Sequence, residues 1–184
     1  MKAMEALHSR VSVPRLSDPA PDQTSLENIY KAAFRAADHA LLKPWRFLLI
    51  QGDSRKKLGD LFVEAALKQD SDISFEKQAN IRNKPLRAPL IIVCISSPRE
   101  HPKVPVFEQY LSTAAACQNI LVAAHAMGFG AMWRTGSMAY HETVLKGLGL
   151  SQHERIIGFI YVGTINGPRK VLNEANPDEF FKDW

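Results

Sequence analysis

The sequence contains only two cysteines among its 184 residues. Neither belongs to a CxxC motif: Cys94 lies in an apolar run typical of a strand, and Cys117 lies in an apolar run typical of a helix. Cysteines in such runs are most often buried thiols. We therefore predict two buried free thiols and no disulfide framework, which suits a reducing compartment.

Long hydrophobic runs are also absent. The longest apolar stretches, such as residues 90–95, are far shorter than the roughly 20 residues needed to span a bilayer. The first ten residues carry no apolar stretch like that of a signal peptide. We therefore expect no membrane partner and, by default, a cytoplasmic location.

Several catalytic motifs are missing. The six histidines are scattered, with no pair at the i,i+4 spacing of a helical metal site, so we predict no metal centre. There is no GxSxG nucleophile elbow and no Walker A loop. Residues 128–130 read Gly-Phe-Gly, but Trp133 occupies the third position of a dinucleotide fingerprint, and the segment follows a predicted helix where that fingerprint follows a strand.

The net charge of +4 is small, and the basic residues are dispersed. The densest basic region, residues 77–87, contains no aromatic side chain on which a base could stack. This pattern argues against a nucleic-acid partner. A small anionic ligand would account for a few arginines equally well.

Hydrophobic periodicity predicts alternating helices and strands. A helix should begin near Ser25, because Thr24 and Glu27 have the spacing of a capping box, and it should end before Pro44. Residues 70–87 are polar and predict a partly mobile segment. The other helices are expected over residues 2–9, after Asp53, over 104–127 and over 140–148; strands are expected over 45–51, 88–96 and 155–164, with a short strand or turn in 128–136. This order indicates an α/β or α+β class with a three-layer core.

Three segments carry chemistry that could bind an anion. Arg10 and Ser12 lie in a turn after the first helix, and a guanidinium with a hydroxyl and free amides suits a phosphate. Arg35 and His39 are four residues apart and would share one side if the helix persists. A third segment, residues 130–136, places a tryptophan and an arginine between glycines.

Taken together, these segments resemble the FMN-dependent nitroreductase family. The resemblance rests on R-x-S-x-x-R at residues 10–15, on Pro44-Trp45 before a strand, and on an alanine-rich helix that leads into GFG-x-x-WRTG at residues 128–136. The spacing R-x-x-D-H-x-x-x-x-P-W at residues 35–45 is similar to that of a short, minimal subgroup. The match runs from about residue 1 to residue 165.

The resemblance implies a single α+β domain over residues 1–184, built as a three-layer α/β/α nitroreductase-like fold. Its central sheet would be mixed but mostly antiparallel and flanked by helices. It also implies a homodimer with FMN at the subunit interface and a C-terminal tail packed on the partner. The implied cofactor contacts are Arg10, Val11, Ser12, Trp133, Arg134 and Thr135 of one subunit and Arg35 and His39 of the other; the implied nicotinamide segment is Ala123, Ala124, His125, Ala126, Met127 and Gly128.

The implied activity is ping-pong hydride transfer from NADH or NADPH through FMN to a nitroaromatic, quinone or similar small acceptor. Flavin carries this chemistry, so no catalytic side chain is required, although Arg35 and His39 could tune the flavin. Pro14 stands where larger members place a lysine near the flavin, and Ala37 stands where the subgroup has proline. Two alternatives stay open: an FMN carrier or sensor without turnover, and a flavoenzyme that uses oxygen or removes halide.

Overall fold

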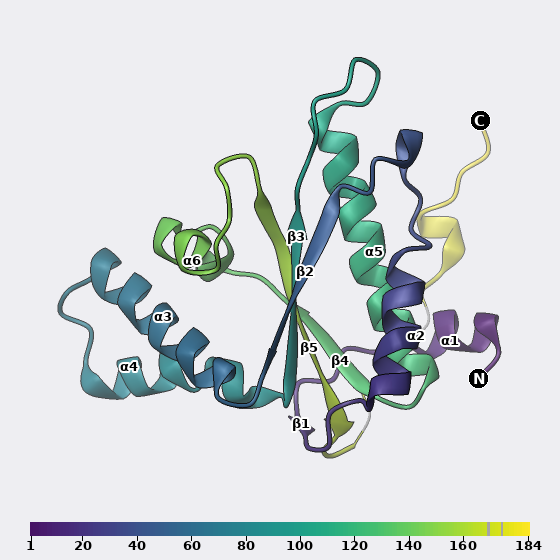
Figure 1. Ribbon diagram of the computed structural model, residues 1–184. Helices are drawn as coiled ribbons and strands as arrows, with labels where there is room; N and C mark the ends of the chain where they lie inside the picture. The colour runs from purple at the N-terminus through teal and green to yellow at the C-terminus, as the bar shows by residue number, and fades with distance from the viewer. Residues whose placement is uncertain (169, 174) are drawn as a thin grey trace.

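A five-stranded sheet forms the centre of the computed structural model, which describes residues 1–168, 170–173 and 175–184 (Figure 1). The strands are β1 (Leu16–Ser17), β2 (Trp45–Gln51), β3 (Leu90–Ser96), β4 (Gly130–Arg134) and β5 (Arg155–Ile165). Their order is β1-β5-β3-β2, and β4 also pairs with β5. Every strand pair that the described chain forms is antiparallel, so the expected mixed sheet was wrong in that detail.

Helices cover both faces of the sheet, which gives the predicted three-layer α+β architecture. The helices are α1 (Ala3–Ser9), α2 (Gln23–Ala33), α3 (Ser54–Gln69), α4 (Phe75–Arg82), α5 (Val106–Ala126) and α6 (Glu142–Gly147). In Figure 1, α3, α4 and α6 lie on one side of the sheet, and α1, α2 and α5 lie on the other. Short 3-10 turns are η1 (His39–Leu41), η2 (Lys84–Arg87), η3 (Ser137–Ala139) and η4 (Pro177–Glu179).

The central strand β3 divides the hydrophobic core in two. Successive side chains of a strand point to opposite faces, and all seven residues of β3 are buried. Ile91, Val93 and Ile95 belong to the core under α3 and α6, whereas Leu90, Ile92 and Cys94 belong to the core under α2 and α5. Cys94 and Cys117 are both buried and free, as predicted.

The segment expected to be partly mobile instead forms α4 and η2. The Ser74 side chain caps α4 by accepting a hydrogen bond from the backbone N–H of Lys77 at 3.2 Å. Ile81 is buried, and Gly59 lets α3 approach α4 closely, since a Cβ there would lie 2.2 Å from the carbonyl oxygen of Arg82. A small buried contact thus orders a segment whose composition is mostly polar.

The second helix differs from the prediction at both ends. Asp22 caps α2 by accepting a hydrogen bond from the Ser25 backbone at 2.8 Å, so the helix starts before the expected capping box. The helix ends at Ala33, with Phe34 as its C-cap, about ten residues before Pro44. No helix in the described chain is both long enough and apolar enough to cross a membrane.

Candidate functional site

The segment after α1 runs beside β4 as extended chain. Arg10 ends the helix in an extended conformation, and the backbone N–H of Val13 donates to the carbonyl of Ala131 at 3.0 Å. Val11 and Val13 are buried, so this segment is anchored by alternate apolar side chains, while Ser12 between them is exposed. The anchoring fixes the position of Arg10 and Ser12 relative to β4.

A first cavity of about 470 Å³ opens beside this segment. Its lining residues are Arg10, Ser12, Val13, Pro14, Met132, Pro168, Lys170 and Leu172. It therefore presents a guanidinium, a hydroxyl and an ammonium group, and no described lining residue is acidic. Such a donor set suits a phosphate group. The sequence prediction missed Lys170, whose only signal is its place in a short basic stretch after β5.

Strand β4 turns its side chains alternately to the two faces of the sheet. Trp133 packs into the α2–α5 core, and its indole Nε1 donates to the carbonyl of Ile157 at 3.2 Å. Arg134 faces the other way, with its guanidinium carbon 5.3 Å from the centre of the Tyr161 ring. Trp133 and Arg134 are therefore adjacent in sequence, but their side chains lie on opposite faces of the sheet.

A second cavity, of about 450 Å³, lies on the Arg134 face. Lys84 and Arg87 of η2 line it together with Arg134 and Thr135, and Met132 lines both this cavity and the first. The sequence prediction singled out Arg134 and Thr135 but missed Lys84 and Arg87, because only the folded chain brings η2, packed against α3, to the same cavity as β4.

Burial and a neighbouring cation act on Arg134 in the second cavity. Burial lowers the pKa of Arg134, and the nearby positive charge of Arg87 lowers it further, while Tyr161 acts in the opposite direction. Burial also raises the pKa of Tyr161 to about 12, so its hydroxyl is neutral near pH 7. The Arg134 Nε atom is buried and has no hydrogen-bond partner among the described residues.

Arg35 and His39 are separated from both cavities. Because α2 ends at Ala33, they do not share one helical face, and neither lines either cavity. His39 is exposed and its Nδ1 lies 2.7 Å from a carboxylate oxygen of Glu108 on α5. One chain alone therefore does not bring Arg35 and His39 to the other two predicted segments, residues 10–15 and 130–136.

The predicted nicotinamide segment forms the end of α5. Ala124 and His125 are buried, and the His125 Nε2 lies 2.8 Å from the Ser9 hydroxyl of α1. Gly128 ends the helix with a φ of 88°, the left-handed conformation expected of a residue just past a helix C-terminus. A nicotinamide role for residues 123–128 stays a prediction.

A metal site is not evident. Within the described ranges, no group of three or more histidine, cysteine, aspartate or glutamate side chains is placed to hold a metal ion.

Comparison with known proteins identifies the fold and the family. The chain is 38% identical over 164 residues to the Escherichia coli K12 protein named "Putative NAD(P)H nitroreductase YdjA", covering 89% of this chain and 88% of that one. Among solved structures, a nitroreductase-like family protein of Bacillus cereus matches with a TM-score of 0.83 at 24% identity, over 100% of this chain and 96% of that one.

A second solved structure, a nitroreductase with bound FMN from Bacteroides fragilis, matches with a TM-score of 0.72 at 16% identity, over 100% of this chain and 98% of that one. At these identities the two structures show a shared fold. The model of the family described as "Nitroreductase family" matches residues 7–164, which include β4 and most of both cavities. This chain belongs to the nitroreductase family.

Proposed function

We propose that the protein is an FMN-dependent NAD(P)H oxidoreductase that reduces a nitroaromatic, a quinone or a similar small acceptor. Support comes from the family, from the NAD(P)H nitroreductase name of the Escherichia coli relative and from the FMN bound in the Bacteroides fragilis structure. The observation that carries the proposal is the first cavity, with its phosphate-suited donors beside β4.

The residues of this cavity fit the phosphate end of FMN. Arg10 and Lys170 would supply the two positive charges that a phosphate dianion calls for, and the Ser12 hydroxyl would donate one hydrogen bond. Val11, buried beside them, would contribute through its backbone. The sequence has no dinucleotide-binding fingerprint for an adenylate half, which favours FMN over FAD.

The strand β4 would carry the rest of the cofactor. Met132 lines both cavities, and Trp133, Arg134 and Thr135 line the second, so these three residues would contact the flavin where the two cavities adjoin. When bound there, FMN would supply the chemistry of hydride transfer between NADH or NADPH and the acceptor. The chain binds and orients the two substrates in turn and excludes water; protons for the acceptor can come from solvent.

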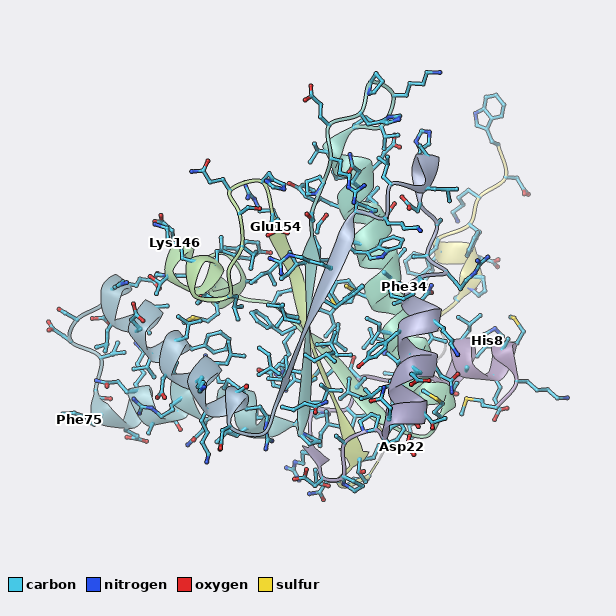
Figure 2. All side chains as sticks on the ribbon, viewed as in Figure 1. His8, Asp22, Phe34, Phe75, Lys146 and Glu154 are labelled. Carbon is cyan, nitrogen blue, oxygen red and sulfur yellow. The ribbon has the colours of Figure 1, made fainter. Side chains whose placement is uncertain are left out.

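A homodimer would complete the site. Arg35 and His39 lie away from the cavities of their own chain, so they could contact flavin only in the site of a partner subunit. Large apolar side chains are exposed on the side of α1, α2 and α5, where Figure 2 shows Phe34 at the end of α2. The exposed members of this apolar side are Met4, Leu7, Phe34, Leu41, Val106, Phe107, Leu111, Phe180, Phe181 and Trp184.

The visible spectrum of the purified protein tests the proposal. Yellow protein that releases FMN on denaturation, or colourless protein that takes up added FMN, agrees with it; protein that fails to take up FMN contradicts it. Anaerobic addition of NADPH or NADH then separates an enzyme from a carrier or sensor. In an enzyme, the visible absorbance of the flavin should bleach within the turnover time, because the flavin is reduced. In a carrier or sensor, the flavin should stay oxidised.

A further inference from the structure

The segment after α2 holds His39 in a strained backbone. Ala40, Leu41 and Lys43 have φ angles of 60°, 55° and 49°, the left-handed region that residues other than glycine rarely adopt. Asp38 fixes this shape, because its carboxylate accepts a hydrogen bond from the Lys43 backbone at 2.7 Å and its carbonyl accepts one from the Leu41 backbone at 3.2 Å. Strain of this kind persists only where the surrounding structure enforces it, and it clusters at functional sites.

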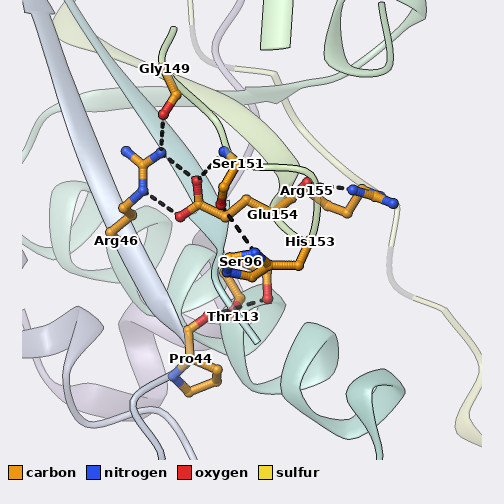
Figure 3. A network of polar contacts seen from close by, with 9 residues as sticks. All are labelled: Pro44, Arg46, Ser96, Thr113, Gly149, Ser151, His153, Glu154 and Arg155. Carbon is orange, nitrogen blue, oxygen red and sulfur yellow. Dashed lines mark hydrogen bonds and ion pairs between the residues drawn. The ribbon is translucent and has the colours of Figure 1, made fainter. Parts of the chain in front are cut away.

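Helix α5 holds the same segment at two points. The buried Thr113 hydroxyl donates to the carbonyl of Pro44 at 3.0 Å, which anchors the end of the segment (Figure 3). Glu108, on the same helix, lies 2.7 Å from the Nδ1 atom of His39. Because an ionised carboxylate only accepts hydrogen bonds, Nδ1 is the donor. The Nε2 atom of His39 makes no hydrogen bond within the described part of the chain, so it is the nitrogen available to another molecule.

The contact between Glu108 and His39 lies among exposed apolar side chains. Phe107 and Leu111, neighbours of Glu108 on α5, are 68% and 53% exposed, and Leu41 in the strained segment is 79% exposed. All three belong to the apolar side that the proposed homodimer would cover. A carboxylate covered by such an interface is costly unless it is hydrogen-bonded. His39 supplies that hydrogen bond, so the contact would persist when the partner subunit docks.

These observations give Glu108 a role in the proposed flavin site. His39 lines neither cavity of its own chain, so in the proposed dimer it would meet the flavin of the partner subunit. We propose that Glu108 is a positioning residue that fixes the ring orientation and the Nδ1–H tautomer of His39, so that Nε2 is presented to that flavin. This inference rests on the proposed function, although its first test needs no flavin.

Nuclear magnetic resonance of the isotope-labelled full chain tests the tautomer. At about pH 8.5, above the ordinary titration range of histidine, long-range proton–nitrogen correlations distinguish Nδ1–H from Nε2–H. We expect the Nδ1–H form of His39 to predominate in wild type and to lose its predominance in Glu108→Ala. Glu64→Ala is the control and should leave His39 unchanged, because Glu64 pairs with Lys68 on α3, on the other side of the sheet.

A double-mutant cycle tests whether the contact serves the flavin. His39→Ala should raise the Kd of FMN at least about threefold, the effect of losing one hydrogen bond. Glu108→Ala should also raise it at least about threefold, but by less than about 1.5-fold when His39 is already alanine. Glu108→Gln keeps the size of the side chain, but its amide can donate as well as accept, so its effect should be intermediate. This variant serves if Glu108→Ala folds poorly.

Two results would overturn the inference while the proposed function stands. The first is a His39 tautomer that is the same in Glu108→Ala as in wild type, which means that Glu108 does not set it. The second is a Kd of FMN that Glu108→Ala leaves unchanged, or raises equally with and without His39. Wild-type protein that takes up no FMN would overturn the proposed function together with the flavin step of the inference, and the tautomer would still decide the role of the contact.

Discussion

Arg46 on β2 and Glu154 just before β5 form a bidentate ion pair across the end of β3 (Figure 3). The Arg46 Nε and Nη2 atoms donate to the two carboxylate oxygens at 2.6 and 2.7 Å. Nη2 also donates to the carbonyl of Gly149, and the Ser151 backbone donates to Glu154 at 3.0 Å. Glu154 is 5% exposed, so the pair ties two strands and the loop after α6 at one point.

The pair predicts a specific dependence of stability on pH. The hydrogen bonds from Arg46 lower the pKa of Glu154 from 4.5 to about 2, against the opposing effect of burial. Since the folded-state pKa is depressed, this stabilisation is complete above pH 4.5 and is lost as the pH falls toward 2. Because Arg46 is one-third exposed, we expect Glu154→Gln to reduce the free energy of unfolding at pH 7 by about 1–3 kcal/mol.

Urea unfolding of wild type and Glu154→Gln at pH 7, 4 and 3 measures the effect. The difference between the two proteins should shrink as the pH falls below 4.5, because the Glu154 carboxylate of the unfolded wild-type chain becomes protonated while that of the folded protein stays ionised. Glu142→Gln, which removes an exposed pair with Lys146, is the control and should change stability little at any of these pH values. A difference that stays constant from pH 7 to pH 3 would contradict the assignment.

Arg10 should distinguish FMN from riboflavin. If its guanidinium holds the phosphate, Arg10→Ala should weaken FMN binding by about 1.5–3 kcal/mol, or roughly 10- to 150-fold, and leave riboflavin binding unchanged. Arg15→Ala is the matched control, because Arg15 is in the same segment but does not line the cavity. Fluorescence titration of the apoprotein gives both affinities. Equal losses for the two flavins would argue against a phosphate contact.

Arg35 should act across the subunit interface. Arg35→Ala is expected to lower the midpoint potential of bound FMN, because a cation near the pyrimidine ring stabilises the charge that appears on reduction. Dye-linked redox titration measures this potential.

Mixing subunits tests whether Arg35 belongs to the partner's site. In a dimer of one Arg10→Ala and one Arg35→Ala subunit, one site would carry both changes and the other would carry neither. About half of the sites should then regain wild-type affinity and potential. If every site in the mixed dimer stays defective, Arg35 acts within its own chain.

Local sequence patterns predicted most of the helices and strands, but they did not predict which distant residues the fold brings together at the site. Alternation and β-branched residues located β2, β3 and β5, whereas the two-residue strand β1 has no periodicity to detect. Arg10, Ser12 and Arg134 stood out as polar side chains in apolar or glycine-flanked surroundings. Lys84 and Lys170 did not, because only the folded chain brings them to cavities that residues of β4 also line.

The C-terminal tail should contribute to dimerisation. Phe180 and Phe181 are 72% and 80% exposed in the single chain, and burying two such side chains is worth roughly 3–6 kcal/mol before ordering costs. Deletion of residues 177–184 should therefore weaken the dimer, as measured by sedimentation velocity over a range of concentrations. A double Phe180→Ser, Phe181→Ser variant should reproduce the loss. A wild-type monomer that still holds FMN would refute the dimeric site itself.

Gly158 on β5 should be essential for the position of β4. A Cβ at Gly158 would lie 2.0 Å from the Trp133 Nε1 atom, so Gly158→Ala must displace the indole from its hydrogen bond to Ile157. Overpacking of this kind costs about 1–3 kcal/mol. Since Met132 and Arg134 flank Trp133 and line the cavities, the displacement should also weaken FMN binding.

The control for this change is Gly147→Ala on α6. Its Cβ would meet the end of the Leu61 side chain at 2.5 Å, which is also overpacking, but on the α3–α6 side, where a flexible leucine can move. Near-ultraviolet circular dichroism reports the tryptophan environment, and fluorescence titration reports the FMN affinity. We expect both to change in Gly158→Ala and neither in Gly147→Ala. If Gly158→Ala lost stability but bound FMN as tightly as wild type, the side-chain positions on β4 would not determine cofactor binding, and the flavin would have to rest on the N-terminal segment and the partner subunit instead.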